Sequence, residues 1–356
     1  MIHLCIDARM INASGIGTCI QNIIPFLSKP PFKLTLLTHS TNDTNHPSIS
    51  FPAPIYSLRE QLYFPFKIPS CDLFWSPHYN APCLPIRSKA RAVTLYDVCH
   101  LAQPISKAKR FAAKILIRNA CRKSQKIITS SAFSKSEILK YVNISEEHIE
   151  VIPLGVNLKE FFPLRNTQEW QKNHQLDFPF FLFVGNVKTH KNLAIALKAF
   201  ELLNPRDCHL VLVGKYTGLR SSDSDILTSI ANSPLKKKIH VLGEVSKNDL
   251  PFLYSSAKAL IFPSLYEGFG LPPLEAMASG CPVLASDAAS IPEVCGDAAL
   301  YFSPHSAKEL AAQMERILIK PSLSLQCMQK GQLRSKAFSW EKTADAYRHL
   351  FQNLCE

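Results

Sequence analysis

The chain has 356 residues, 46% hydrophobic and 19% charged, a composition that excludes a disordered protein and suits about two folded domains. Its apolar runs fall far short of the roughly 18 residues of a membrane-spanning helix, and its first residues, Met1-Ile-His-Leu-Cys-Ile-Asp7, do not resemble a secretion signal. The formal net charge is +12, of which residues 1–178 carry +9, so the first half favours an anionic partner.

The first half alternates short β-rich runs with helical patterns. Strands are predicted at 2–8, 33–39, 72–76, 92–96, 126–130 and 149–153, and helices at 17–27 and 132–142. Short strands separated by helices indicate parallel βαβ units.

A polar segment, 155–179, interrupts this alternation, which then restarts. Strands are predicted at 180–184, 209–213, 239–242, 259–263, 282–286 and 299–302, and helices at 192–203, 223–231, 247–257, 273–279, 306–319 and 339–354. The pattern predicts an α/β protein with an N-terminal domain at 1–160, a linker at 161–179, a C-terminal domain at 180–337 and a final helix at 338–356.

Basic side chains gather in residues 98–136, a segment without Asp or Glu. Lys107, Arg110, Lys114, Arg118 and Arg122 fall on one stripe of a helix, with apolar residues between them. A basic amphipathic helix is typical of a protein that lies on an anionic membrane, so we expect 107–126 to contact one. A solvated helix face is the alternative.

The most informative motif is Tyr266-Glu-Gly-Phe-Gly-Leu-Pro-Pro-Leu-Glu275, at a strand-to-helix junction. Its glycines allow a ligand to approach the backbone, and the N–H groups at the helix start favour a phosphate. Glu267 and Glu275 add two carboxylates that accept hydrogen bonds from sugar and ribose hydroxyls. The motif therefore indicates a sugar-nucleotide site, the alternative being two solvated glutamates beside a helix cap.

These residues resemble a known family. Together with Ile6-Asp-Ala-Arg-Met10, Gly15-Ile-Gly17, Lys191-Asn192 and Pro292-Glu-Val-Cys-Gly-Asp-Ala-Ala-Leu-Tyr-Phe302, the motif is similar to the retaining glycosyltransferases of family 4, over nearly the whole chain. The resemblance implies the GT-B fold, in which two Rossmann-like domains face a cleft and the last helix packs back on the N-terminal domain. Within the family, the chain looks most like mannosyltransferases of bacterial surface polysaccharide.

The resemblance also implies roles for individual residues. Glu267 would contact donor-sugar hydroxyls, Glu275 the ribose hydroxyls, and Lys191 the diphosphate. Further donor-binding residues would be Gly15, Gly17, Gly185, His190, Val245, Phe269, Gly270 and Leu271.

Three positions depart from the family's common pattern. Tyr96 stands where a histidine often approaches the donor sugar, and its hydroxyl is expected to bond a sugar hydroxyl instead, the alternative being a strand-end tyrosine packed on the core. His190 and Thr18 replace arginines that related enzymes often carry.

The expected activity is transfer of a hexose, mannose first, from a GDP- or UDP-sugar to a lipid-linked or oligosaccharide acceptor. The absence of an Asp-x-Asp motif near the donor residues predicts a reaction without a metal cofactor. Scattered cysteines predict reduced thiols in a cytoplasmic protein. The resemblance, together with the basic helix, implies a place at the inner face of the cytoplasmic membrane. A nucleotide-sugar epimerase or hydrolase is the alternative. A nucleic-acid-binding protein fits the charge alone, without a matching motif.

Overall fold

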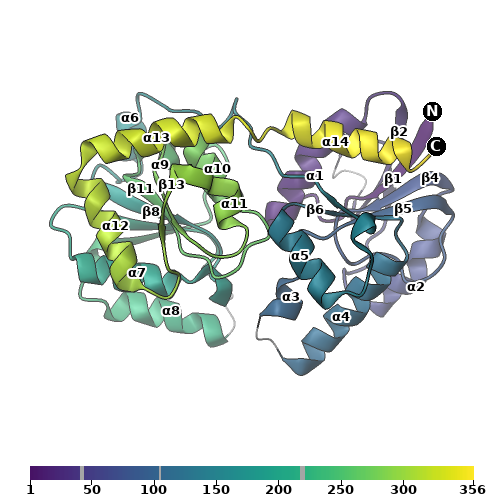
Figure 1. Cartoon of the computed structure of the whole chain (residues 1–356), viewed down its shortest axis with the longest axis horizontal. Helices are drawn as coiled ribbons and strands as arrows, with labels where there is room; N and C mark the ends of the chain where they lie inside the picture. Colours follow the sequence, from purple (N-terminus) through teal and green to yellow (C-terminus); the bar gives the residue numbers. More distant parts are fainter. Residues whose placement is uncertain (41–43, 104–105, 217–220) are drawn as a thin grey trace. The chain divides into compact units, whose positions relative to one another are not determined.

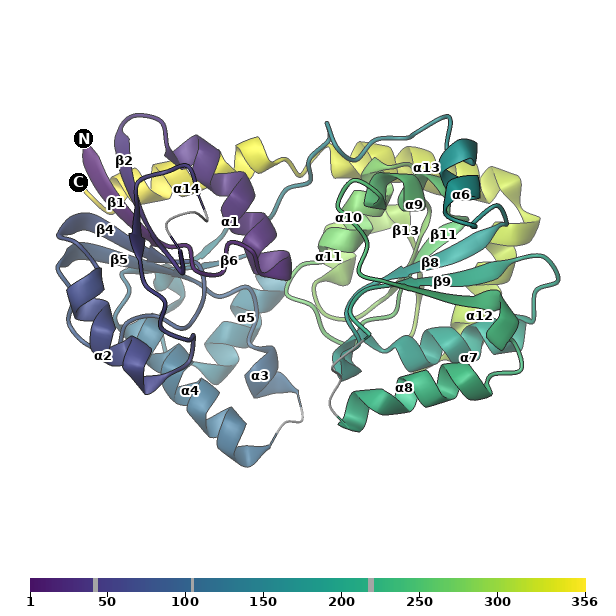
Figure 2. The ribbon, with the colours of Figure 1, turned by 180° about the vertical axis from the view of Figure 1, so that it is seen from behind.

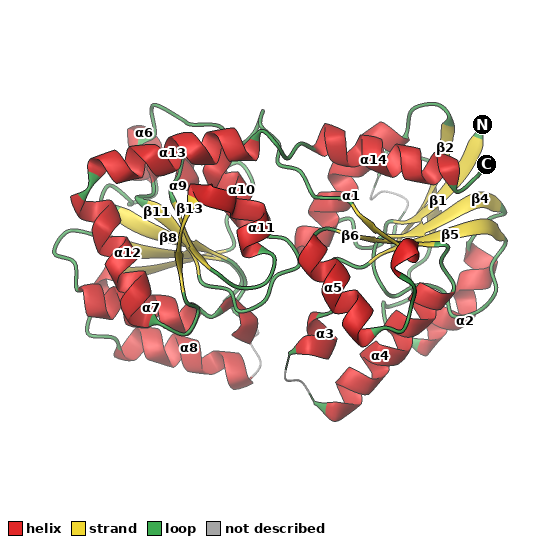
Figure 3. Ribbon diagram, in the orientation of Figure 1, coloured by secondary structure: helices red, strands yellow, loops and turns green. Residues whose placement is uncertain are grey.

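The computed structural model describes residues 1–40, 44–103, 106–216 and 221–356. The chain forms two compact units (Figure 1). Unit 1 contains Met1–Gly155 and Trp340–Glu356, and unit 2 contains Val156–Ser339. Each unit is a parallel sheet between two layers of helices (Figure 3).

Unit 1 is built on a seven-stranded sheet with the order β3-β2-β1-β4-β5-β6-β7. Its strands are β1 (Ile2–Asp7), β2 (Phe32–Thr38), β3 (Ser48–Ser50), β4 (Cys71–Ser76), β5 (Ser88–Thr94), β6 (Lys126–Thr129) and β7 (Ile149–Val151). The chain leaves β1 for β2 on one side and later returns to place β4 on the other. The strand order therefore reverses between β1 and β4, and ligands of open parallel sheets bind outside the carboxyl ends of strands at such a point.

The helices of unit 1 cover both faces of this sheet. They are α1 (Ser14–Leu27), α2 (Leu58–Lys67), α3 (Cys99–Ala102), α4 (Lys107–Arg122), α5 (Ala132–Tyr141) and α14 (Trp340–Asn353). α1 and α14 pack together on one face, whereas α2, α4 and α5 lie on the other (Figure 2). The prediction that the final helix returns to the N-terminal domain is confirmed.

Aromatic packing explains why α14 belongs to unit 1. The buried rings of Tyr347 and Phe351 lie 5.1 and 5.5 Å from the ring of Trp75 on β4, measured between centroids. Large buried aromatic side chains dominate core energetics, so this contact ties the last helix to the first sheet. The Arg348 guanidinium adds a hydrogen bond of 2.7 Å to the Phe26 carbonyl oxygen at the end of α1.

Unit 2 is built on a six-stranded sheet with the order β10-β9-β8-β11-β12-β13. Its strands are β8 (Phe180–Val184), β9 (His209–Val213), β10 (Ile239–Gly243), β11 (Ala259–Phe262), β12 (Val283–Ser286) and β13 (Ala299–Phe302). The helices are α6 (Gln168–Asn173), α7 (Leu193–Leu203), α8 (Ser221–Asn232), α9 (Leu250–Ser256), α10 (Leu271–Ala278), α11 (Ile291–Cys295), α12 (Ala307–Ile319) and α13 (Pro321–Ser335). Here the strand order reverses between β8 and β11.

Two features of the fold differ from the sequence interpretation. The segment expected to be a linker, 161–179, forms α6 and belongs to unit 2, where the Trp170 indole donates a 3.0 Å hydrogen bond to Asp249. Helices α2 and α13 were not predicted, because α2 carries an internal proline and exposed apolar residues, and the polar residues of α13 hide its periodicity. Among the described helices, none is long and apolar enough to span a bilayer.

Candidate functional site

The site in unit 2 centres on an ion pair between Lys191 and Glu267. The Nζ atom of Lys191 lies 2.6 Å from Oε1 of Glu267, and the two side chains are 19% and 13% exposed. Lys191 follows β8 and Glu267 follows β11, so the pair stands where the strand order of unit 2 reverses. The sequence placed both residues in the donor site, and the structure brings them into direct contact.

The backbone around Lys191 is held by its neighbour, Asn192. Asn192 adopts a left-handed conformation, with φ 56° and ψ 38°, between the short 3-10 turn Thr189–Lys191 and helix α7. Its side-chain amide donates hydrogen bonds to the carbonyl oxygens of Pro263, at 3.1 Å, and Pro304, at 2.8 Å. The His190 carbonyl accepts a further bond, 2.7 Å long, from the N–H of Leu265. Both loops of the site are therefore fixed to each other through main-chain groups.

Hydrogen bonds from Ser290 hold the loop that carries Glu267. The fully buried Ser290 hydroxyl lies 2.9 Å from both the Glu267 and the Phe269 carbonyl oxygens. Gly270 follows with φ 123°, a conformation that side chains rarely adopt, and is the N-cap of α10. Because Pro272 and Pro273 lack N–H groups, the peptide donors nearest the helix start belong to Gly270 and Leu271.

Glycines form the carboxyl ends of three neighbouring strands. Gly185 follows β8, Gly214 follows β9, and Gly243 ends β10 with φ 75°. A Cβ atom on Gly214 would lie 2.1 Å from the Gly185 carbonyl oxygen, so this close approach requires glycine. Val245, half-buried, comes two residues after Gly243 at the same edge of the sheet. The predicted contacts at Gly185 and Val245 thus share an edge with Lys191.

Glu275 lies one turn into α10, with its carboxylate directed at a buried tyrosine. The Tyr254 hydroxyl donates a 2.9 Å hydrogen bond to Oε2 of Glu275. Burial raises the pKa of Glu275 to about 7, although the bond from Tyr254 opposes the shift. A carboxyl group with this pKa changes its charge near neutral pH, so a ligand that needs the carboxylate has to compete with a proton.

In unit 1 the sequence predicted three site residues, Gly15, Gly17 and Tyr96. Gly15 and Gly17 belong to the first turns of α1 rather than to a preceding loop, and a Cβ atom on Gly17 would lie 2.5 Å from the Ile11 carbonyl oxygen. The Tyr96 hydroxyl is buried against the Cys19 thiol, and burial raises its pKa well above the usual value. The expected catalytic contact of Tyr96 with a sugar is not consistent with this placement, because the hydroxyl packs inside unit 1.

Sequence reasoning did not assign roles to several residues that build the unit 2 site. Ser290, Gly214 and Tyr254 act on Glu267, Gly185 and Glu275 from other loops and helices, so spacing within a motif does not reveal them. Asn192 entered only as part of the Lys-Asn motif; the available signal in the sequence was its residue type, since asparagine is enriched in the left-handed conformation that it adopts here.

Two doubly wound parallel sheets, each in its own compact unit, are the architecture of the GT-B class, and the Lys191–Glu267 pair lies where the strand order of the second sheet reverses. A model described as Glycosyltransferase Family 4 matches residues 13–160, and one described as Glycosyl transferases group 1 matches residues 165–334. The chain belongs to family 4 of the glycosyltransferases. The predicted family is confirmed, and with it the broader enzyme class, a hexosyltransferase.

Relatives and solved structures agree with this assignment. The chain is 32% identical to O-antigen chain mannosyltransferase B of Escherichia coli, over 76% of this chain and 74% of the relative. It is 30% identical to O-antigen chain mannosyltransferase RfbU of Salmonella typhimurium, over 74% and 69%.

The fold matches a sucrose-phosphate synthase of Thermosynechococcus elongatus with a TM-score of 0.84 at 20% identity, covering 99% and 98% of the two chains. It also matches the Anabaena protein HepE in complex with UDP-glucose, with a TM-score of 0.83 at 15% identity, covering 99% and 100%. These matches confirm the predicted fold class.

Proposed function

We propose that this protein transfers mannose from a nucleotide sugar to a growing bacterial surface polysaccharide, with retention of the anomeric configuration. The observation that carries the proposal is the half-buried Lys191–Glu267 pair in a chain whose relatives are O-antigen mannosyltransferases. The pair offers one cation and one carboxylate at the same point, which suits a ligand that carries a diphosphate next to a sugar.

Donor binding separates this ion pair in the proposed mechanism. The Lys191 ammonium turns to the diphosphate, whose negative charge grows as the bond to the sugar breaks, and so stabilises the leaving group. Glu267, released from its partner, accepts hydrogen bonds from sugar hydroxyls. The N–H groups of Gly270 and Leu271 add neutral donors near the same phosphate groups.

In this proposal Glu275 and the glycine-bearing carboxyl ends of β8, β9 and β10 bind the nucleoside. The Glu275 carboxylate accepts hydrogen bonds from both ribose hydroxyls, while the hydrogen bond from the Tyr254 hydroxyl keeps the carboxylate oriented. Gly185 and the backbone at Val245 leave room for the base because they lie at the ends of β8 and β10. His190 holds its loop through its carbonyl group.

Lys191 supplies the positive charge that a divalent ion supplies in other sugar transferases, so we propose transfer without a metal cofactor. Activity that survives EDTA supports this, and activity restored only by Mg²⁺ or Mn²⁺ contradicts it.

A donor screen followed by product analysis tests the central proposal. Thermal shifts with GDP-mannose, UDP-glucose and ADP-glucose identify the donor, since a ligand at 100 times its Kd stabilises a protein by about 2.7 kcal/mol. NMR of the product then reads the anomeric configuration of the transferred sugar. Mannose transferred to an O-antigen acceptor with the anomeric configuration of the donor supports the proposal. Free sugar released at the same rate without acceptor identifies a hydrolase, and a changed sugar nucleotide an epimerase.

We also propose that unit 1 lies on an anionic membrane through α2 and α4. The exposed side chains of Leu58, Leu62 and Phe66 follow one face of α2, at 85%, 60% and 84% exposure. α4 carries two exposed apolar side chains of its own, Phe111 and Ile115, at 66% and 51% exposure.

The two helices cover the same face of the sheet (Figure 2), and Cys83 joins them through bonds from its N–H to Gln61 and to its thiol from Asn119. Apolar side chains beside a basic helix match a surface of anionic headgroups over acyl chains.

Vesicle flotation tests this surface. Replacing Lys107, Lys109, Lys114 and Arg122, all exposed on α4, by Gln removes about 1 kcal/mol per residue and lowers partition into phosphatidylglycerol vesicles roughly 10³-fold. The matched control replaces Lys198, Lys236, Lys237 and Lys308, exposed in unit 2, by Gln and is expected to float like the parent. If the α4 variant floats as well as the control, α4 is a solvated helix and the membrane proposal is wrong.

A further inference from the structure

Two structural demands meet at Asn192, the residue that follows Lys191. The first is on its backbone, which is left-handed, with φ 56° and ψ 38°, where the 3-10 turn ends and helix α7 begins. The N–H of Asn192 donates to the Thr189 carbonyl at 3.1 Å, and its own carbonyl accepts from the N–H of Ile195 at 3.2 Å. One residue therefore closes the turn and opens the helix. Apart from glycine, asparagine and aspartate tolerate this conformation best.

The second demand is on the side chain of Asn192. Its amide nitrogen donates to the Pro263 carbonyl at 3.1 Å and to the Pro304 carbonyl at 2.8 Å. Pro263 directly follows β11 and begins the loop that carries Glu267, and Pro304 lies just beyond β13. An amide nitrogen has two hydrogens, so both donors are used. Glycine and aspartate suit the same backbone but lack these donors, and asparagine meets both demands.

The side chain of Lys191 depends on the turn that Asn192 holds. The lysine stem passes close to the Gly185 backbone, because a Cβ atom on Gly185 would lie 3.8 Å from Cδ of Lys191. The ammonium lies 5.5 Å from the centroid of the buried Phe262 ring and 2.6 Å from Oε1 of Glu267. These groups receive the end of the side chain, whereas the backbone at 191 and 192 sets the direction in which the stem leaves the chain.

We propose that Asn192 is the residue that positions the Lys191 ammonium for the reaction. Its left-handed backbone sets the direction of the lysine stem, and its two amide bonds fix the turn to the loop of Glu267 and to the end of β13. The inference rests on the transferase function proposed above, in which Lys191 stabilises the leaving diphosphate. Because a misplacement of about 1 Å at a reacting group costs about 10² in rate, Asn192 controls turnover through Lys191.

A series of substitutions separates the two demands. Asn192→Gly keeps the left-handed backbone but loses both donors, whereas Asn192→Ala loses the donors and also strains the backbone. We expect kcat to fall about tenfold in Asn192→Gly and about 10²-fold in Asn192→Ala, with the KM of the donor within about threefold of the parent value in both. Wild-type kcat in Asn192→Ala, in an enzyme whose Lys191→Met variant is slow, overturns the proposal.

Asn204 provides the matched control. It is also left-handed, with φ 43° and ψ 56°, but it is exposed and lies at the opposite end of α7 from Lys191. Asn204→Ala therefore introduces the same backbone strain and should lower the midpoint of thermal unfolding, while kcat stays within about twofold of the parent value. A kcat loss in Asn204→Ala as large as that in Asn192→Ala would assign the effect to strain in α7 and overturn the proposal.

A double-mutant cycle tests whether Asn192 acts through Lys191. In the Lys191→Met background, Asn192→Ala should lower kcat by less than about threefold, because no ammonium is left to position. A fall of about 10²-fold in both backgrounds means that Asn192 acts on another group, and this result overturns the proposal.

A crystal structure of the Asn192→Ala chain separates this inference from the proposed function. The Lys191 ammonium is expected to lie more than about 1 Å from its place in the parent protein, with its 2.6 Å contact to Glu267 lost. An unmoved ammonium overturns the positioning role, independently of the reaction that the protein performs. If the ammonium moves but Lys191→Met transfers mannose at the wild-type rate, the positioning of Lys191 by Asn192 stands and the proposed role of Lys191 in the reaction fails.

Discussion

The two sheets place charged residues at equivalent points, but they use them differently. In unit 1, Arg9 is 1% exposed, pairs with two carboxylates and stacks on Phe51 and Phe64, with ring centroids 4.4 and 4.8 Å from its guanidinium carbon. In unit 2, Lys191 is 19% exposed and pairs with Glu267. The arginine is enclosed in a network, whereas the lysine has a flexible stem and lies at the protein surface.

This difference separates a structural cation from a reactive one. Removing one member of a buried, fully bonded ion group leaves an unpaired charge in the interior, which is costly. Lys191, at 19% exposure, exchanges its partner at a smaller cost than Arg9 does, because solvent reaches the pair and the ammonium has no fixed fork geometry. We therefore expect Arg9 to determine stability and Lys191 to determine turnover.

The largest expected effect is on stability, in Arg9→Met. The substitution leaves Glu60, whose side chain is fully buried, opposite Asp7 without a cation, so the free energy of unfolding should fall by about 3–5 kcal/mol. Urea unfolding of the full chain, followed by tryptophan fluorescence, measures the loss. Arg9→Lys keeps the charge and should lose less. A loss below about 1 kcal/mol would show that Arg9 is as replaceable as a surface residue.

The next effect is on the reaction, in Lys191→Met. Loss of the cation opposite the diphosphate should lower kcat about 10²-fold, with little change in unfolding free energy. Lys191→Arg should restore part of the rate, since the charge remains and its reach differs. Steady-state kinetics and unfolding curves of the same preparations provide the comparison. If Lys191→Met kept the wild-type kcat, other residues would have to hold the diphosphate.

A smaller effect concerns the pH dependence of donor affinity. The pKa of Glu275 is raised to about 7, so roughly a tenth of the protein carries the carboxylate at pH 6 and most of it does at pH 8. If ribose hydroxyls require the carboxylate, donor affinity should rise about tenfold between these values. Glu275→Gln should bind more weakly at pH 8 and show a flat profile. A sloped profile in Glu275→Gln would assign the titration to another group.

The same raised pKa has a consequence for stability with the opposite sign. Because folded Glu275 holds its proton to higher pH than the unfolded chain does, the folded state binds more protons between about pH 4.5 and 7. Stability should therefore fall as pH rises through this window, and Glu275→Gln should reduce that fall. Urea midpoints at pH 5 and 8 measure it, and identical pH slopes in both proteins would count against the raised pKa.

The smallest effect is expected in Ser290→Ala. The buried hydroxyl supports the carbonyl groups of Glu267 and Phe269, so its loss should cost about 1 kcal/mol of stability and lower kcat a few-fold through a looser loop. Ser286→Ala is the control, since its buried hydroxyl bonds the Ser264 carbonyl at 2.6 Å, further from Glu267 along the same segment. If Ser286→Ala lost more kcat than Ser290→Ala, the contact at Ser264, and not that of Ser290, would position the loop.

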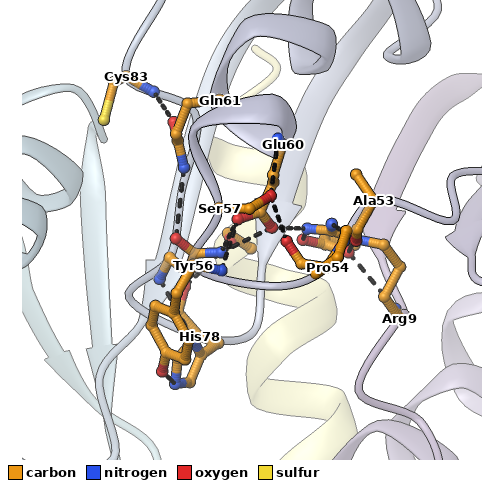
Figure 4. Close-up of polar contacts among 12 residues, drawn as sticks. Arg9, Ala53, Pro54, Tyr56, Ser57, Glu60, Gln61, His78 and Cys83 are labelled. Carbon is orange, nitrogen blue, oxygen red and sulfur yellow. Dashed lines mark hydrogen bonds and ion pairs between the residues drawn. The ribbon is translucent and has the colours of Figure 1, made fainter.

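The sequence was sufficient for the fold class, because apolar strands alternate regularly with helices in both halves, but not for α2, α13 or the segment 161–179. It also singled out Lys191 and Glu267, which the structure brings into contact, because the glycine-rich motif and the Lys-Asn pair are local; their role in donor binding stays a prediction. It failed for Tyr96, because spacing does not tell whether a tyrosine at a strand end faces solvent or, as here, a thiol on α1. The network joins Arg9 to Glu60 (Figure 4), 51 positions along the chain, and Glu60 to Asn80, 20 positions further, so only the fold reveals it.

The most direct test of the account is an experimental structure of the chain with GDP-mannose bound. The account predicts that the Lys191 ammonium lies within hydrogen-bonding distance of a diphosphate oxygen and that its separation from Glu267 exceeds about 4 Å, with Glu267 on sugar hydroxyls. An ion pair still at the 2.6 Å of the free protein, with the donor bound elsewhere, would contradict it.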